Sequence, residues 1–136
     1  MTYRTIMYPL QVGADNLILR TVATPVKDIT LDIISFSDDL LELMREYKGV
    51  GLAAPQIGKS WRIIATTQWK KGKKEDKLLA ETIMINPEII EHSSETFVLE
   101  EGCLSLPGIQ VNVSRYKHIV VRFLSTENDL LTMSLE

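Results

Sequence analysis

Apolar residues recur at helical spacing in one part of the chain and alternate with polar residues further on. The helical pattern lies between Thr30 and Gly49, and its apolar members are Ile33, Ile34, Phe36, Leu40, Leu41, Leu43, Met44 and Tyr47. Residues three and four positions apart share one face of a helix, so this pattern predicts an amphipathic helix. Thr30 has a side chain suited to capping a helix N-terminus, and Gly49 predicts where the helix ends.

After Gly49 the pattern changes to short segments in which apolar and polar residues alternate, as in β-strands. The predicted strands are 62–67, 82–85, 88–92, 96–99, 109–113 and 117–124. The last is the most regular, with Ile119, Val121 and Phe123 on one face. No repeat or linker separates two cores, and 136 residues suffice for one core, so we expect residues 1–136 to form a single domain.

Composition and charge narrow the class of protein. Hydrophobic residues make up 45% of the chain and charged residues 24%, which is a globular balance. The net charge of −3 argues against a broad electrostatic contact with nucleic acid, and we expect no specific DNA binding. The basic run KKGKKEDK at Lys70–Lys77 offers two interpretations, a contact with RNA or a phosphate surface and a solvated hairpin tip. The second is the more common for such runs.

The cysteine content and the first residues bear on the compartment. The single cysteine excludes an intrachain disulfide, so nothing marks an oxidising compartment. Among the first twenty residues, Arg4, Pro9, Asp15 and Arg20 interrupt the apolar positions, which fits neither a signal peptide nor a membrane span. We therefore expect a soluble, cytoplasmic protein without a membrane partner.

The segment GVGLAAPQIG, residues 49–58, interrupts the regular patterning just after the predicted helix. Gly49 and Gly51 permit positive φ, and two alanines keep side chains short, so another backbone can approach this part of the chain. The amide of Gln56 offers two donors and one acceptor. The alternative is a tight helix-to-strand turn in which Gln56 faces water.

The segment EEGCLSLPG, residues 100–108, places the only cysteine, Cys103, behind two carboxylates. Carboxylates disfavour a neighbouring thiolate, so this is an unfavourable position for a free reactive cysteine. Three interpretations remain open, namely a small buried thiol, a nucleophile and a metal ligand. A nucleophile needs a positive neighbour, and His92 and His118 are the only histidines. A bound dication deprotonates a thiol outright, so the local pattern favours metal ligation over nucleophilic catalysis.

The two segments, in this order, resemble the first two signature motifs of peptide deformylases. The preceding helix, the tripeptide Ile85–Pro87 and Arg115 fit the same pattern, so the resemblance covers essentially the whole chain. It implies an α+β fold with antiparallel and mixed β-sheets packed around helices. It also implies a metal-dependent hydrolase that removes the formyl group from the initiator methionine of new bacterial or organellar proteins. The implied partners are N-formylmethionyl nascent peptides, including those at the ribosome.

The resemblance also implies the catalytic roles of three residues. Cys103 would bind a divalent metal through its thiolate, with Fe²⁺ expected in the cell and Ni²⁺ or Zn²⁺ as substitutes. Gln56 and the backbone N–H of Leu104 would donate hydrogen bonds to the oxyanion that forms when water activated by the metal attacks the formyl carbon. Such donors each contribute about 3–4 kcal/mol to transition-state stabilisation.

Substrate binding and structural support are assigned by the same resemblance. Val50 and Gly51 would hydrogen-bond the peptide backbone, so that the substrate adds as an extra strand. Glu101 and Arg115 would form a supporting ion pair, which would direct the charge of Glu101 away from the thiol. This pair is expected to be structural rather than catalytic.

One part of the family pattern is not found in these 136 residues. The third motif, HExxH, supplies two histidine ligands and a glutamate that acts as general acid and base. Neither His92 nor His118 is followed by a histidine four residues later, and Leu130–Glu136 lies about where the family enters the helix that carries this motif. One thiolate cannot by itself hold a catalytic metal, which ordinarily needs three protein ligands.

Three explanations are open. In the first, the chain is part of a complete deformylase. In the second, it is an inactive deformylase-like module that binds N-terminal peptides. In the third, Cys103, His92 and His118 form an improvised metal site. The intact signature residues favour the first, since a binding module has little use for a metal cysteine and an oxyanion glutamine. We therefore expect residues 1–136 by themselves to be inactive and incompletely packed.

Overall fold

The computed structural model describes residues 2–70, 74–75 and 77–136. Its helices are α1 (Tyr3–Met7), α2 (Leu17–Arg20) and α3 (Leu31–Glu46), with a 3₁₀ helix η1 at Ala54–Ile57. Its strands are β1 (Gly51–Ala53), β2 (Ile63–Lys70), β3 (Lys77–His92), β4 (Thr96–Cys103), β5 (Leu106–Tyr116), β6 (Ile119–Leu124) and β7 (Leu130–Leu135). No described helix combines the length and the apolar composition that a membrane crossing needs.

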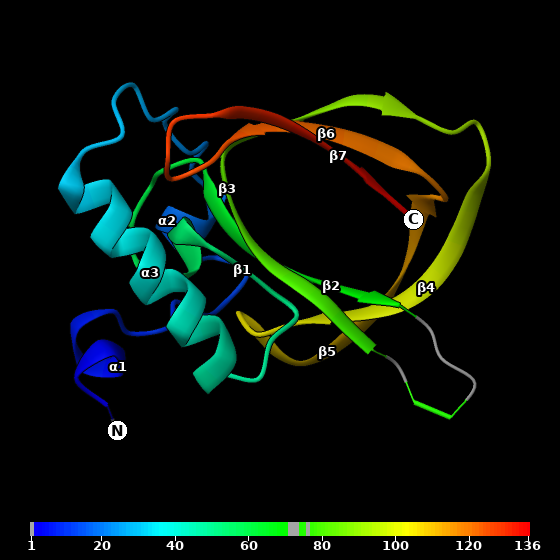
Figure 1. The fold of residues 1–136 in the computed structure, drawn as a ribbon. Coiled ribbons are helices and arrows are strands. Elements are labelled where there is room, and N and C mark those ends of the chain that lie inside the picture. The colour runs from blue at the N-terminus through cyan, green and yellow to red at the C-terminus, as the bar shows by residue number, and fades with distance from the viewer. Residues whose placement is uncertain (1, 71–73, 76) are drawn as a thin grey trace.

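The strands form two antiparallel sheets. Five of them pair in the order β1-β2-β3-β6-β7, and β4 and β5 pair only with each other. Figure 1 shows the helices gathered on one side, while the strands curve around an open centre. The expected α+β fold is confirmed, with antiparallel pairing in every ladder of the described strands.

The predicted helix is confirmed as α3, and its two ends have different causes. The Thr30 side chain accepts a hydrogen bond from the backbone N–H of Ile33 at 3.3 Å, as expected of an N-cap. The prediction that Gly49 ends the helix is wrong, because Lys48 takes the left-handed conformation with φ of 56°. The buried face of α3 is the predicted one, formed by Ile33, Phe36, Leu40, Leu43 and Met44.

The five-stranded sheet separates a large core from a small one. Successive residues of a strand point to opposite faces, so Ile85 packs in the cluster under α3 while Met84 packs on the other face. Val121 and Phe123 join Met84 there and are almost fully buried. The alternation predicted for 117–124 is therefore confirmed in β6.

Other strand boundaries differ from the predicted ones. The segments 82–85 and 88–92 belong to one strand, β3, which continues through Asn86 and Pro87 with a shift of register. The short strand β1 and the last strand β7 were not predicted. The hairpin tip expected at Lys70–Lys77 lies largely outside the described residues, although β2 and β3 pair as far as Lys70 and Lys77.

Asn86 links β3 to the chain that precedes α3. Its side chain accepts from the backbone N–H of Val26 and donates to the carbonyl of the same residue, both at 2.8 Å. Asn86 also adopts a left-handed conformation with φ of 53°, which asparagine tolerates better than most residues. One side chain thus satisfies two backbone groups at the register shift in β3.

Gly49 lies against the turn between β4 and β5. An added Cβ at Gly49 would meet the Cδ1 atom of Leu104 at 2.8 Å, whereas one at Gly51 would have an ordinary contact of 3.7 Å with the Ala65 carbonyl. Neither glycine has a positive φ, so the close approach does not depend on a left-handed conformation at either position. The close approach predicted for this segment is present, and at Gly49 it joins the two sheets.

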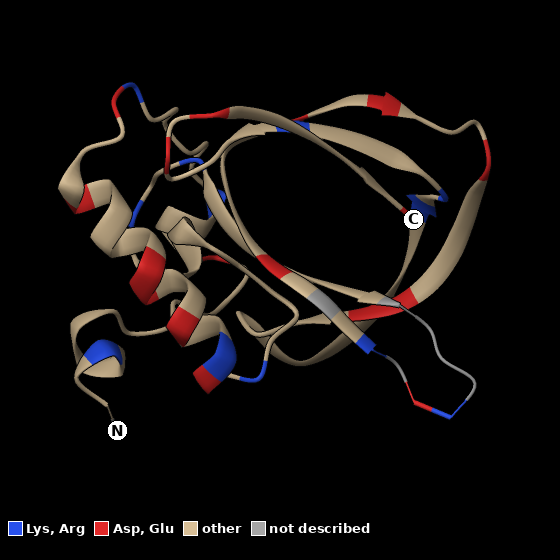
Figure 2. Ribbon diagram, viewed as in Figure 1, with Lys and Arg blue, Asp and Glu red and all other residues tan. Residues whose placement is uncertain are grey.

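Acidic positions recur along the ribbon of α3 (Figure 2). Asp32 lies in the first turn of this helix and Arg45 in the last, which suits the helix dipole. Arg4 of α1 pairs with Asp39 of α3 at 3.1 Å and so holds the first helix against the third.

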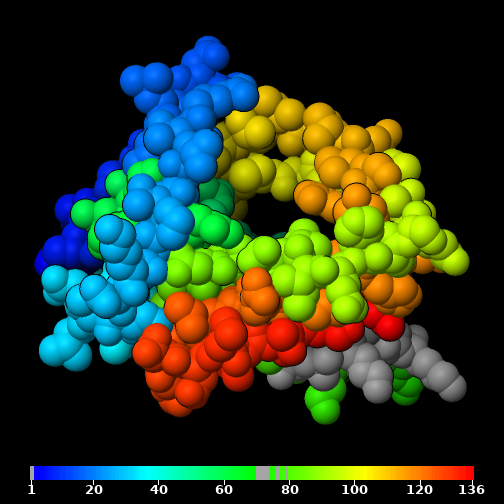
Figure 3. Space-filling view, turned by 90° about the horizontal axis from the view of Figure 1, so that it is seen from above, coloured from blue at the N-terminus to red at the C-terminus, as the bar shows by residue number. Residues whose placement is uncertain are grey.

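Large apolar side chains of the strands remain exposed. Ile89 of β3, Val98 of β4, and Ile109 and Val111 of β5 are each 50–65% exposed. Figure 3 shows that the molecule has an opening through its centre, next to these strands. Exposed apolar area of this extent fits the expectation that residues 1–136 are incompletely packed.

Replacing Asn86 should destabilise the fold more than replacing a comparable asparagine. We expect Asn86→Ala to lose about 2–3 kcal/mol in free energy of unfolding, from two hydrogen bonds and a strained left-handed alanine. Asn128→Ala is the control, because Asn128 has a similar φ of 64° in the turn before β7. It should lose only about 1 kcal/mol. Equal losses in urea denaturation would contradict the role given to the Asn86 side chain.

Gly49→Ala should force Leu104 to move. We expect a loss of about 1–3 kcal/mol in free energy of unfolding because the new methyl overlaps a packed side chain. Gly51→Ala, with an ordinary contact, should change stability by less than about 0.5 kcal/mol. A double-mutant cycle with Leu104→Ala should give a favourable coupling energy, since truncating Leu104 leaves room for the methyl. Additive effects would show that the two residues do not contact each other.

Candidate functional site

A cleft of about 570 Å³ lies where the two segments that break the sequence pattern come together. One wall is the chain from the end of α3 through β1 to η1, and the other is the β4–β5 turn. Its lining residues are Lys48, Gly49, Val50, Gly51, Gln56, Gly102, Cys103, Leu104 and Pro107. The cleft therefore contains most of the residues that the sequence singled out.

Gln56 and Cys103 face each other in this cleft. The Gln56 Nε2 atom lies 3.6 Å from the Cys103 Sγ atom, although 47 positions separate the two residues. The two segments that break the sequence pattern thus bring these side chains into one pocket. Cys103 is exposed at the end of β4, where a shift of register after Gly102 interrupts pairing with β5. The interpretation of Cys103 as a small buried thiol is therefore wrong.

The Gln56 side chain is held in place at both ends. Its Oε1 atom accepts from the backbone N–H of Ala53 at 2.8 Å, and its Nε2 atom lies 3.1 Å from the Ser105 Oγ atom. The backbone around it is also fixed, because Pro55 lies at the start of the 3₁₀ helix, directly after Ala54, and Gly58, with φ of 90°, ends it. The alternative in which Gln56 simply faces water is wrong.

Leu104 follows Cys103 directly, so its backbone N–H lies next to the thiol. Its side chain is half-buried and packs against Gly49, on the opposite wall of the cleft. This contact fixes the turn that carries both the thiol and the neighbouring N–H. The donor that the structure shows beside the sulfur is the Gln56 amide nitrogen, at 3.6 Å.

The strand β1 lies at the edge of the five-stranded sheet. It pairs with β2 on one side, with Gly51 opposite Thr66, and the Val50 carbonyl accepts from the N–H of Thr67 at 2.9 Å. The Val50 side chain is 69% exposed. Backbone groups on the other side of an edge strand are available to an added strand, so a peptide can align there in extended form.

The expected ion pair between Glu101 and Arg115 is present across the β4–β5 hairpin. The guanidinium donates two hydrogen bonds, each of 2.7 Å, to the two carboxylate oxygens. This bond lowers the pKa of Glu101 and raises the pKa of Arg115. The carboxylate of Glu101 is thus engaged by a guanidinium, as predicted.

The two histidines take part in other contacts. The His92 ring stacks on Tyr116 with 3.9 Å between centroids, and the His118 Nδ1 atom lies 3.4 Å from the Glu136 carboxylate. Within residues 2–70, 74–75 and 77–136, no three His, Cys, Asp or Glu side chains are grouped so that they can hold a metal. The improvised metal site of Cys103, His92 and His118 is therefore wrong.

A metal is accommodated only in part by the described residues. Cys103 offers one exposed thiolate ligand, and the Gln56 amide beside it is a donor and not a competing cation. A catalytic metal ordinarily has three protein ligands and one open position. These residues fit a divalent metal as one ligand of a larger set, and no catalytic step through the metal follows from them alone.

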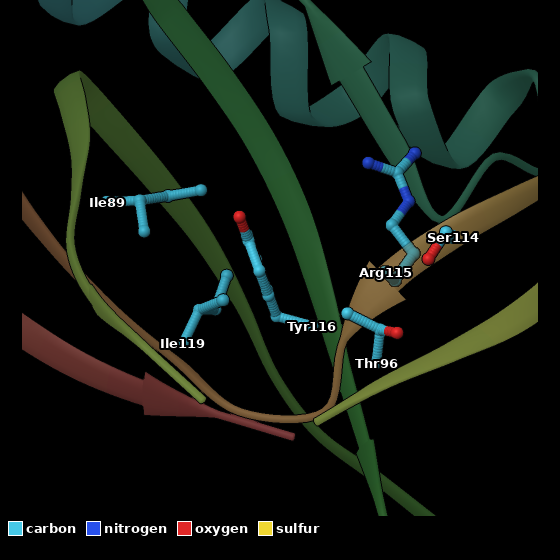
Figure 4. Close-up of a pocket in the computed structure, with 6 residues that line it drawn as sticks. All are labelled: Ile89, Thr96, Ser114, Arg115, Tyr116 and Ile119. Carbon is cyan, nitrogen blue, oxygen red and sulfur yellow. The ribbon is translucent and has the colours of Figure 1, made fainter. Parts of the chain in front are cut away.

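A second cavity of about 350 Å³ lies between the ends of β3, β6 and the β4–β5 hairpin (Figure 4). It is lined by Ile89, Thr96, Ser114, Arg115, Tyr116 and Ile119. No thiol, imidazole or carboxylate is among these lining residues, and the Arg115 guanidinium is bound to Glu101. This cavity therefore lacks the soft metal ligand that the cleft has in Cys103.

Sequence reasoning missed some residues that support the cleft. Ser105 is almost fully buried and contacts Gln56, and its position inside EEGCLSLPG is a signal that points to it. Gln11 and Gly13 donate backbone hydrogen bonds to the carbonyls of Gln56 and Ser105. Backbone donors of this kind leave no side-chain pattern, so nothing in the sequence indicated them.

Comparisons with known proteins agree with the fold and the cleft. The family described as "Polypeptide deformylase" matches residues 7–136. A peptide deformylase from Orientia tsutsugamushi (strain Ikeda) is 40% identical over 130 residues, 92% of this chain and 72% of that protein. One from Brachyspira hyodysenteriae is 42% identical over 113 residues, 82% of this chain and 59% of that protein. The chain thus spans 59–72% of the length of these two relatives.

A solved structure gives the same result in three dimensions. The Met-Ala-Ser-bound class I type b peptide deformylase from Acinetobacter baumannii has a TM-score of 0.85 and is 28% identical, with 97% of this chain and 85% of that chain covered. The match includes the curved sheet and the hairpin that carry the two halves of the cleft. On these grounds the chain belongs to the peptide deformylase family of metal-dependent hydrolases.

Proposed function

We propose that the chain carries the peptide-binding and oxyanion-binding side of a peptide deformylase, which hydrolyses the formamide bond of N-formylmethionyl peptides. The observation that carries this proposal is the 3.6 Å approach of the Gln56 amide to the Cys103 sulfur, beside the edge of β1. A donor, a soft metal ligand and a peptide-binding edge thus lie in one cleft. Family membership adds to this support.

The substrate peptide binds along β1 in our proposal. Val50 and Gly51 would hydrogen-bond an extended peptide, which places its N-terminal formyl group toward Gln56 and Cys103. This is supported by the edge position of β1 and by the Acinetobacter baumannii protein, whose crystal structure contains Met-Ala-Ser. The substrates would be nascent chains, met at the ribosome as their N-termini emerge.

The oxyanion is stabilised by donors that are already aimed. Gln56 Nε2 and the Leu104 backbone N–H would both donate to the oxygen of the formyl group as it gains charge. Each such donor contributes about 3–4 kcal/mol in other hydrolases, because the folded protein has already fixed its direction. The Ala53 N–H and the packing of Leu104 against Gly49 provide that fixed direction here.

Cys103 would bind the metal, which we propose to be Fe²⁺ in the cell, with Ni²⁺ or Zn²⁺ as substitutes. A thiolate is a soft ligand that suits these ions. When bound, the metal activates a water for attack on the formyl carbon. The other two ligands and the general base would come from an HExxH helix, as the family motif prescribes. Glu101 and Arg115 would hold the hairpin in shape.

We further propose that residues 1–136 act as a single deformylase-like domain in the cytoplasm, or in an organelle if the source is eukaryotic. The domain proposal is supported by the core cluster, which joins α3 to β1, β2 and β3. The location is supported by the bacterial relatives. This location also suits the proposed substrate, because ribosomes make nascent chains in the same compartment.

Cys103→Ser should weaken metal binding and abolish turnover, since a hydroxyl is a far poorer ligand for these ions than a thiolate. The measurements are bound Ni²⁺ and hydrolysis of a formyl-Met peptide, with an HExxH helix supplied as described below. His92→Ala is the control and should leave both unchanged, because the His92 ring is engaged with Tyr116. Unchanged metal content and rate in Cys103→Ser would show that the thiol has no role as a ligand.

Residues 1–136 should gain metal binding, thermal stability and turnover together when an HExxH helix is supplied, fused or as a separate peptide. Covering large exposed apolar side chains contributes roughly 1.5–3 kcal/mol each, and the helix also brings two ligands and the base. A helix with both histidines changed to alanine is the control, which should stabilise without metal or turnover. Turnover by residues 1–136 alone would contradict the ligand argument, and binding of peptide without turnover in any mixture would favour the inactive module.

A further inference from the structure

Ser105 is unusual among the polar side chains of the described residues because it is buried beside the candidate site. Among the described polar residues, only Ser37 and Ser105 are buried, at 0% and 3% exposure. Ser37 donates to the Ile33 carbonyl within α3, which is a common arrangement for a helix serine. Ser105 instead contacts the Gln56 amide, 49 positions away in the sequence.

The orientation of the Gln56 amide follows from its partners. The Ala53 backbone N–H can only donate, so the Gln56 atom 2.8 Å from it must be the oxygen. The amide nitrogen therefore lies on the side of Ser105 and Cys103, at 3.1 Å from the first and 3.6 Å from the second. This nitrogen carries two hydrogens, one for each neighbour.

A third segment fixes the distance between Gln56 and Ser105. The Gln11 N–H donates to the Gln56 carbonyl at 2.7 Å, and the Gly13 N–H donates to the Ser105 carbonyl at 2.9 Å. Gly13 has φ of 103°, and an added Cβ would touch nothing within 4 Å. The conformation, and not the space, therefore requires glycine at this position.

We propose that Ser105 is a positioning residue for the oxyanion donor. By accepting one Nε2 hydrogen of Gln56, its hydroxyl leaves the other hydrogen directed into the cleft beside Cys103. Residues 11–13 keep the two partners at the spacing that this needs. The inference rests on the proposed function for its catalytic consequence, while the orientation of the amide can be tested without metal or substrate.

The first experiment measures exchange with water of the Gln56 side-chain amide protons by ¹H–¹⁵N NMR in the metal-free chain, with Gln56→Ala to assign the signal. Ser105→Ala should accelerate exchange of the slower proton about tenfold, the equivalent of losing one hydrogen bond. Ser105→Thr, which keeps the hydroxyl, should restore slow exchange. Gly13→Ala should accelerate exchange without touching either side chain.

Ser37→Ala is the matched control, because it removes the other buried hydroxyl, which bonds within α3 and not to Gln56. It should lower thermal stability but leave the Gln56 exchange rates unchanged. If Ser105→Ala behaves like Ser37→Ala, with lower stability and unchanged exchange, then Ser105 is a packing residue and the inference is overturned.

The second experiment measures turnover of a formyl-Met peptide with the HExxH helix supplied. Ser105→Ala should lower kcat about tenfold with little change in KM, since a misdirected donor weakens only the transition state. A change confined to KM would overturn the inference. If the unmodified chain shows no turnover, the proposed function fails, and the exchange measurement still decides whether Ser105 orients Gln56.

Discussion

The arrangement of the candidate site depends on one joint between two sheets that share no ladder. The β4–β5 hairpin carries Cys103, and the chain beside the five-stranded sheet carries Gln56. Hydrogen bonds to Gln56 and Ser105 join the two, together with the packing of Leu104 against Gly49. Each such bond contributes only about 1 kcal/mol, whereas each neighbouring sheet is held by ladders that pair several residues. The distances in the cleft are therefore set by its least redundant contacts.

The parts of the fold that sequence predicts well are those determined by local pattern. The helix α3 has an apolar face and a threonine cap, and β6 alternates regularly, so each could be read from a short window. The turn after α3 could not, because Lys48 rather than a glycine takes the left-handed conformation. The continuous strand β3 was also hidden, since Pro87 interrupts its pattern and a register shift accommodates it.

In the candidate site, too, local pattern indicates some residues, whereas other contacts depend on tertiary structure. Gln56 and Cys103 could be selected because each lies in a segment that breaks the pattern, and the motif resemblance joined the two segments. Spacing alone could not place them together across 47 positions, because the path of the chain between them includes β2, β3 and β4. The contributions of Gln11 and Gly13 come from backbone N–H groups, which every residue except proline carries. Such contacts depend on tertiary structure and leave no composition to recognise.

The same joint explains how one cysteine can lie behind two carboxylates and still serve a cation. In the sequence, Glu101 is the acidic residue nearer to Cys103, but in the fold its carboxylate accepts hydrogen bonds from two N–H groups of Arg115. The polar group placed against the sulfur is the Gln56 amide nitrogen, a donor from a distant part of the chain. Sequence neighbours therefore do not define the electrostatic environment of this thiol. The hairpin turn exposes the sulfur, and Arg115 is engaged with Glu101. Apart from Lys48, the described residues that line the cleft include no lysine or arginine, so few cations compete with a metal that approaches the sulfur.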